Sequence, residues 1–196
     1  MGVDPAVAAG VASAAGALRD AGYEVEEVDL PAVEEAVDLW AKLVITEVAL
    51  GFLPEVGPIL GKDARSFLDL TIDAIGPADY EGYLTGFIGR QAIMNAWSQF
   101  LDRYPVVVAP VATIQPFPVG QDLKGKDEVL GILQGLRAVV ALNLTGLPAV
   151  VVPSGVEGGL PQGVQVISRW YREDLALQAA GAIEQRLGSL TPIDPR

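Results

Sequence analysis

Hydroxyl and amine side chains are the groups in this 196-residue sequence that could act as a nucleophile and its base. The sequence has no cysteine and no histidine, which excludes thiol nucleophiles, disulfides, cysteine or imidazole metal sites and a Ser-His-Asp triad. A serine nucleophile would therefore need a lysine as its base. The candidates are Ser13, Ser66, Ser98, Ser154, Ser168, Ser189, Lys42, Lys62, Lys124 and Lys126.

The spacing of these residues matches no catalytic motif. There is no G-x-S-x-G elbow, no S-x-x-K pair and no glycine-rich phosphate loop of the G-x-x-x-x-G-K-[ST] or G-x-G-x-x-G type. Lys124 and Lys126 lie in the segment DLKGKD, which is typical of an exposed loop, where a lysine stays protonated and cannot act as a base. The sequence therefore assigns no catalytic residue.

Carboxylates are the remaining chemical groups. Asp69 and Asp73 share a helical face, whereas glycosidase chemistry needs two carboxyls facing each other across a cleft. The acidic residues in 24–29 are typical of a solvated face, and a calcium loop would need Gly and Asn among them. We expect no metal and no cofactor, and keep a carboxylate enzyme that uses a metal as an alternative.

Charge and hydropathy narrow the class of protein. The sequence has 25 acidic and 13 basic residues, a net charge of −12, which disfavours binding to nucleic acid or anionic lipid. Apolar residues make up 51%, enough for a sizeable core, but no stretch reaches the ~18 apolar residues of a membrane span. Residues 5–18 lack the preceding basic segment of a signal peptide. We expect a cytoplasmic protein that binds neither nucleic acid nor membranes.

The two ends of the chain are predicted to alternate helices with strands. Asp4 as N-cap and Pro5 at the first helical position predict a helix that Gly22 ends. A strand over 23–30 follows. Further strands are predicted at 104–111, 146–155 and 159–168, each apolar enough to be buried, and further helices at 127–142 and 173–187. The alternation predicts an α/β fold with a mixed, mostly buried central sheet flanked by helices.

A helical insert is predicted over about 32–104, within a chain (1–196) that forms a single domain or a fragment of a larger one. Helices are expected at 33–53, 64–75 with Asp63 as cap, and 79–103. The last of these carries an aromatic and aliphatic stripe over more than 20 residues. Such a stripe packs a core or lines an apolar pocket.

The carboxyl ends of two predicted strands are the places where a ligand could bind. One strand ends in Pro110, Val111, Ala112 and Thr113, and another ends in Pro153, Ser154 and Gly155. Proline has no N–H group to donate to a neighbouring strand, so the ending of the strands explains these prolines equally well without a ligand.

Three blocks of sequence resemble the closing pattern of the amidase signature family. They are YPVVVAPVA (104–112), NLTGLPAVVVPSG (143–155) and GLPQGVQVISRWYRED (159–174), followed by LALQAAGAIE (175–184). The opening residues 4–31 resemble the helix-strand unit that follows the signature segment in that family. The resemblance covers nearly the whole chain, is strongest in 104–112 and 143–184, and predicts the C-terminal part of the amidase signature fold.

The resemblance also implies what is missing. Family members hydrolyse amides with a serine, a second serine on a cis peptide bond and a lysine. The serines lie in a Gly- and Ser-rich segment that this sequence lacks, and no residue here matches the catalytic lysine. Asn143, Gly146 and Pro148 match the family's turn into a central strand, and Gly159, Pro161, Gly163 and Gln165 match the next turn and strand, so these residues are expected to act as scaffold.

By the same resemblance, six apolar residues are candidates for the walls of an acyl pocket: Tyr83, Phe87, Trp97, Leu136, Val139 and Val140. The expected function is the C-terminal part of an amidase-type hydrolase, inactive alone, which binds a small-molecule amide once the N-terminal part completes it. The alternative is a non-catalytic binding or self-assembly module that retains the fold and forms a homo-oligomer through exposed apolar surface.

Overall fold

The computed structural model describes residues 2–188. Within them the chain forms two compact units, which we describe separately. The first unit contains residues 2–31, 96–116 and 146–188, and the second contains residues 32–95 and 117–145. The prediction of one domain, or of a fragment of a larger domain, stays a prediction.

The first unit is built on a three-stranded sheet in the order β1-β3-β2. The strands are β1 (Val106–Pro110), β2 (Ala149–Glu157) and β3 (Leu160–Ser168). Both pairings are antiparallel, so β1 and β2 run in the same direction on either side of β3. Gly158 and Gly159, both with positive φ, make the tight turn between β2 and β3. The predicted α/β fold class is confirmed.

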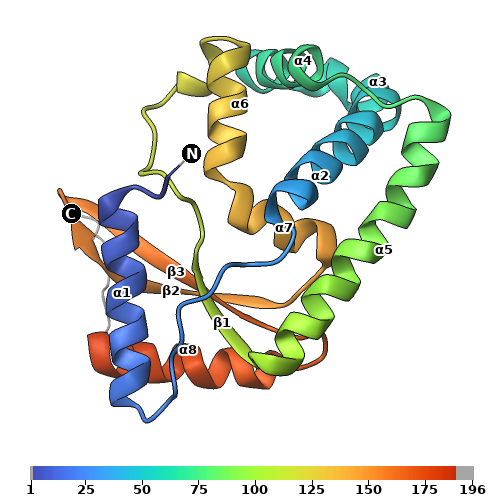
Figure 1. The fold of residues 1–196 in the computed structure, drawn as a ribbon. Helices are drawn as coiled ribbons and strands as arrows, with labels where there is room; N and C mark the ends of the chain where they lie inside the picture. Colours follow the sequence, from blue (N-terminus) through green and yellow to red (C-terminus); the bar gives the residue numbers. More distant parts are fainter. Residues whose placement is uncertain (1, 189–196) are drawn as a thin grey trace. The chain divides into compact units, whose positions relative to one another are not determined.

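Two helices cover one face of this sheet, as Figure 1 shows. They are α1 (Pro5–Asp20) and α8 (Glu173–Leu187). Their alanine-rich faces pack on Val152, Val164 and Val166 of the sheet and form one buried core. Small side chains let the helices lie close to the strands, and the β-branched valines fill the pleated surface.

The predicted ends of these helices are confirmed where the signal was local. Asp4 Oδ1 accepts a hydrogen bond from Ala6 N at 2.9 Å and caps α1. Gly22 follows the helix with φ +92°, and the amide of Tyr23 donates back to Leu18 O, as at a left-handed C-terminus.

The second unit is helical. Its elements are α2 (Val33–Glu47), a π-helical turn η1 (Val48–Phe52), α3 (Leu53–Val56), a 3₁₀ turn η2 (Gly57–Ile59), α4 (Lys62–Ile75), the first part of α5 (Tyr80–Arg103), a 3₁₀ turn η3 (Gln121–Leu123), α6 (Lys126–Gly135) and α7 (Arg137–Thr145). Here α2 packs against α7, and α4 packs against α6.

Two predicted helices contain breaks. The helix expected over 33–53 becomes α2 followed by a π turn, in which Leu53 N donates to Val48 O just before Pro54. The helix expected over 127–142 bends by 72° between α6 and α7. The break follows the buried Gly135, and Leu136 N donates to both Ile132 O and Leu133 O as the first helix ends. The predicted Asp63 cap is also wrong, because α4 begins two residues earlier, at Lys62 after Gly61.

The strand predicted over 23–30 is not formed, because no strand of the described chain pairs with it. Tyr23 and Val25 still pack on the core of the first unit. The prediction that the strand at 146–155, now identified as β2, is buried is also wrong for one of its two faces. Val152 is 5% exposed on the face under the helices, whereas Val151 on the other face is 61% exposed.

Candidate functional site

Of the two strand ends that the sequence predicts, Pro110 lies at the end of β1, whereas β2 continues past Pro153 to Glu157, so that prediction is wrong for Pro153. Pro110 of β1 is paired with Val164 of β3, and Val152 of β2 is paired with that same residue from the other side. Pro110 and Pro153 therefore flank β3 at neighbouring positions. Pro110 has no amide to donate to a further strand, which agrees with its place at the end of the ladder.

A chain of side-chain amides connects β3 and the loop after β1 to the start of α1. Gln162 Nε2 donates to Gln115 Oε1 at 2.8 Å, and Gln115 Nε2 donates to Asp4 Oδ1 at 3.3 Å. The amide of Asp4 donates to Thr113 O at 2.8 Å. These bonds hold the loop after β1 against the first turn of α1. The sequence analysis missed this network, because no motif places Gln115 near Gln162.

Gln165 is fixed from the neighbouring strand. Its Nε2 donates to Pro110 O at 3.0 Å, and the residue is 1% exposed. This bond satisfies a buried amide and fixes the last carbonyl of β1. The scaffold role that the resemblance implies for Gln165 therefore has a physical basis in this contact.

The serines and lysines of the described chain do not form a nucleophile–base pair. The hydroxyl of Ser168 donates to Arg172 O at 2.8 Å, and that of Ser13 donates to Ala9 O at 3.0 Å. Ser154 Oγ is buried with no hydrogen-bond partner, and Lys126 Nζ forms an ion pair with Asp73 at 2.6 Å. Ser189 lies outside the described residues. Between residues 2 and 188, no serine contacts a lysine amine in a hydrogen bond that would activate it.

The six pocket candidates are distributed over both units. Tyr83 and Phe87 lie one turn apart on α5, with their rings edge to face and centroids 5.2 Å apart. Val140 in α7 is buried at 3% exposure, Val139 beside it is half-buried, and Leu136 lies at the break before α7. Their role as pocket walls stays a prediction.

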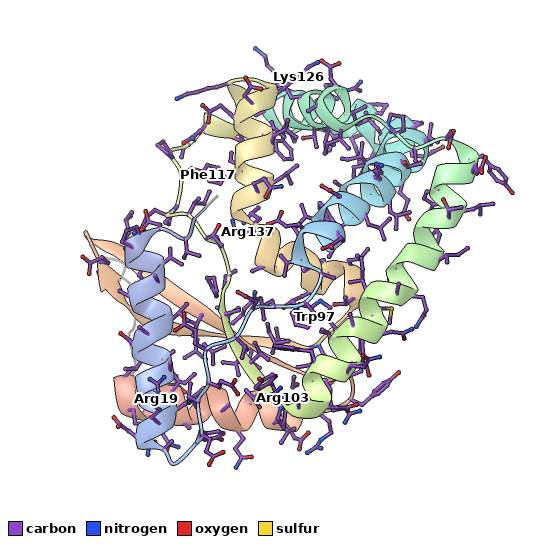
Figure 2. All side chains as sticks on the ribbon, in the orientation of Figure 1. Arg19, Trp97, Arg103, Phe117, Lys126 and Arg137 are labelled. Atoms are coloured by element: carbon purple, nitrogen blue, oxygen red, sulfur yellow. The ribbon has the colours of Figure 1, made fainter. Side chains whose placement is uncertain are left out.

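Trp97, labelled in Figure 2, is a residue of α5, and it lies in the part of that helix that belongs to the first unit. It has no exposed surface and lies edge to face with Phe100, with ring centroids 6.1 Å apart. Its Nε1 is buried without an acceptor among the described residues. The packing of Trp97 is that of a core residue.

Tyr83 makes the one polar contact among the six candidates that changes a pKa. Its hydroxyl donates to Glu47 Oε1 at 2.8 Å. The hydrogen bond to the Glu47 carboxylate, followed by desolvation, raises the pKa of Tyr83 above its usual value. The phenol therefore stays protonated at neutral pH and acts as a donor.

A cavity of about 430 Å³ lies in the second unit, and none of the six candidates lines it. Its walls include Leu39, Lys42, Asp79 and the glycines of α5 at positions 82, 86 and 89. A Cβ at Gly86 would lie 2.8 Å from a methyl group of Leu43, so the glycine face of α5 allows α2 to approach closely. The spacing of these glycines on the predicted helix 79–103 was the signal that sequence reasoning overlooked.

Neither a metal cluster nor a single spanning helix occurs in the described part of the chain. Within residues 2–188, no group of three or more acidic side chains is placed to hold a metal ion. No single helix of this part is both long and apolar enough to cross a membrane. The bent pair α6 and α7, taken together, has the length and composition of a membrane span.

Comparison with known proteins covers nearly the whole chain. The Amidase family model matches residues 1–177. The chain is 36% identical to an indoleacetamide hydrolase of Bradyrhizobium japonicum over 97% of its length and 26% identical to a glutamyl-tRNA(Gln) amidotransferase subunit of Symbiobacterium thermophilum over 94%. It spans 41% and 42% of these two relatives, so it has about two fifths of their length.

Solved structures agree in fold. The chain is similar to 6-aminohexanoate cyclic dimer hydrolase, with a TM-score of 0.76 at 23% identity over 95% of the chain and 42% of that protein. It is also similar to a glutamyl-tRNA(Gln) amidotransferase subunit of Thermotoga maritima, with a TM-score of 0.71 at 25% identity over 94% of the chain and 40% of that protein. With the family model matched over residues 1–177, the chain belongs to the amidase family.

Proposed function

We propose that this chain acts as the C-terminal part of an amide hydrolase and supplies sheet scaffold and substrate-pocket walls. One observation carries the proposal: the chain corresponds to 41% of an amide hydrolase to which it is 36% identical. Amide hydrolysis needs a nucleophile, a base and donors for the oxyanion. In the proposal these groups lie on the other three fifths of the family's length.

The chain's own contribution is the positioning of structural elements. Gln165 holds the last carbonyl of β1, and the Gln162–Gln115–Asp4 chain holds the following loop against α1. A rigid frame of this kind keeps the catalytic groups of a neighbouring polypeptide in the positions that catalysis requires.

The proposed substrate is a small amide with an apolar acyl group. Identity of 36% to an indoleacetamide hydrolase makes indoleacetamide the first amide to test. Tyr83 and Phe87 present an aromatic pair on α5, and an apolar acyl group would gain from burial against such rings. Hydrolysis of the primary amide with one water gives the carboxylate and an ammonium ion.

The experiment combines this chain with the part of the Bradyrhizobium japonicum hydrolase that precedes the aligned region, either co-expressed or fused in one polypeptide. Ammonia release from indoleacetamide is measured for the chain alone, for the added part alone and for the combination. We expect activity in the combination only. Strong amidase activity from the chain alone would contradict the proposal.

A matched pair of variants tests the pocket walls in the combined enzyme. Phe87→Ala is expected to raise KM for indoleacetamide by about tenfold, because the loss of even one methylene contact in an apolar pocket costs roughly 1–3 kcal/mol. Leu84→Ala on the same helix is the control, since Leu84 and Phe87 are 48% and 44% exposed. Equal effects of the two variants would remove Phe87 from the proposed pocket.

Self-assembly without catalysis is the second candidate function, and exposed apolar side chains favour it. Ile59, Tyr80 and Ile88 in the second unit are 83%, 81% and 74% exposed. Exposed apolar side chains mark an interaction site where they form a contiguous patch. Light scattering at high protein concentration distinguishes the candidates, because a clean monomer is incompatible with a self-assembly module.

A further inference from the structure

The cavity of the second unit lies between α2, the loop 76–79 and α5. Its volume of about 430 Å³ falls within the roughly 300–1,000 Å³ of sites that hold small molecules. All of its lining residues belong to the second unit. The shape of the cavity is therefore set by contacts within that unit.

The loop that closes one side of the cavity is tied to both helices. Thr46 Oγ1 accepts a hydrogen bond from Ala78 N at 2.8 Å and donates to Lys42 O at 2.7 Å, which joins the loop to α2. Asp79 Oδ1 accepts from Gly82 N at 2.7 Å, which joins the loop to α5. Because these walls are already held in place, a ligand would bind without the cost of ordering them.

The wall that α5 contributes is bare backbone. Gly82, Gly86 and Gly89 are spaced by four and three residues and so lie on one face of the helix. Leu39 of α2 lies against this face, since a Cβ at Gly86 or Gly89 would be 3.2 or 3.3 Å from one of its methyl groups. The glycines leave space beside α2 that larger side chains would fill.

Two opposite charges line the cavity without pairing with each other. Among residues 2–188, Lys42 Nζ forms no ion pair and no hydrogen bond, and the Asp79 carboxylate bonds only to Gly82 N, through Oδ1. Both side chains are exposed, so a ligand can reach them. In the same unit, Lys126 and Asp73 do pair, at 2.6 Å. The cavity therefore offers one amine and one carboxylate oxygen to a ligand.

We propose that this cavity binds a small zwitterion, a molecule that carries both an amine and a carboxylate. The ligand's carboxylate pairs with Lys42 Nζ, its amine pairs with Asp79 Oδ2, and its carbon chain lies beside Leu39. Two charge-assisted hydrogen bonds favour such a ligand over a molecule with either charge alone. A zwitterion has no net charge, so the net charge of −12 on the protein does not repel it as it repels a simple anion.

The test titrates the full chain with ω-amino acids from glycine to 5-aminopentanoate, at constant ionic strength, with butyrate and butylamine as singly charged controls. Amide resonances of Gly76, Gly82, Gly86 and Gly89 report binding at the cavity. Urea unfolding is the second readout, because a ligand that binds only the folded state raises the midpoint. We expect at least one amino acid to bind about tenfold or more tightly than either control, which corresponds to one additional charge-assisted contact.

Two variants remove the charges and keep the fold. Lys42→Met retains the apolar stem, and Asp79→Asn retains an oxygen that can accept from Gly82 N. We expect each to weaken binding of the amino acid by about tenfold or more. The matched controls are Lys62→Met and Glu81→Gln, which remove the same charges from exposed residues that do not line the cavity. Circular dichroism confirms the fold of each variant.

Each outcome decides the proposal. Binding that both cavity variants weaken and both control variants leave unchanged would support it. Binding of butyrate or butylamine as tight as that of the amino acids would overturn the zwitterion. Equal effects of Lys62→Met and Lys42→Met, resonance shifts away from the cavity, or no binding by any amino acid of the series would overturn the site. Amide hydrolysis is not measured, so failure here leaves the proposed function in place.

Discussion

Ser154 of β2 and Gly10 of α1 are in direct contact: a Cβ placed at Gly10 would lie 2.7 Å from Ser154 Oγ. The same Cβ would lie 3.4 Å from Gln162 Cβ. The missing side chain of Gly10 is therefore the space that the serine occupies, and it sets how closely α1 lies on the sheet. The network from Gln162 to Asp4 runs between the same elements.

Gly10→Ala is expected to destabilise the protein. The added methyl group overpacks the contact with Ser154, at a cost of about 1–3 kcal/mol, which exceeds the ~1 kcal/mol that alanine gains over glycine within a helix. Gly16→Ala in the same helix is the matched control, because nothing lies within 4 Å of its Cβ position. Urea unfolding should show a lower midpoint for the first variant and a higher one for the second. Stabilisation by Gly10→Ala would contradict the contact.

Ser154→Ala is expected to be neutral or stabilising. Ser154 is 5% exposed and its hydroxyl is buried without a hydrogen-bond partner, so the folded state carries the desolvation cost of that group, about 1–3 kcal/mol. The free energy of unfolding measured in urea tests this. Combined with Gly10→Ala, the variant should recover part of the lost stability, and strict additivity of the two changes would argue against direct contact.

Thr46→Val is expected to lower the free energy of unfolding by about 1–3 kcal/mol. Thr46 Oγ1 donates to Lys42 O at 2.7 Å and accepts from Ala78 N at 2.8 Å, so valine leaves the Ala78 amide without its acceptor. Thr85 makes the same bond to the carbonyl four residues earlier, but it is exposed and accepts from no amide. Thr85→Val should change stability by less than about 0.5 kcal/mol. Similar losses for both variants would show that the bond to Ala78 contributes nothing.

The contact between Tyr83 and Glu47 predicts a pH dependence at the alkaline end. The pKa of Tyr83 is raised, first by its hydrogen bond to Glu47. The stabilisation is therefore fully present below the unfolded pKa of about 10 and is lost as the pH rises through the higher folded pKa. In Glu47→Gln, phenolate absorbance should show Tyr83 titrating at lower pH than in the wild type. Glu81→Gln, on α5 with Tyr83, is the control and should leave the titration curve unchanged. An unshifted curve in Glu47→Gln would refute the contact.

Local sequence signals predicted the helices of this protein well, because their causes lie within a few residues. Asp4 caps α1 through the amide of Ala6 two positions away, and Gly188, with φ +80°, follows α8 at its predicted end. The blocks at 104–112 and 143–184 likewise contained enough residues to indicate the amidase family, which the match over residues 1–177 confirms.

Features that depend on distant partners were decided only by the tertiary structure. The segment 23–30 has the composition of a strand, but strand formation needs a neighbour, and the described chain provides none. Burial of β2 on one face only, and the pairing of β1 and β2 with opposite sides of β3, depend on which elements cover each face. Neither Ser154 nor Gly10 indicates in the sequence that the two residues are in contact, because packing depends on which residues the fold brings together.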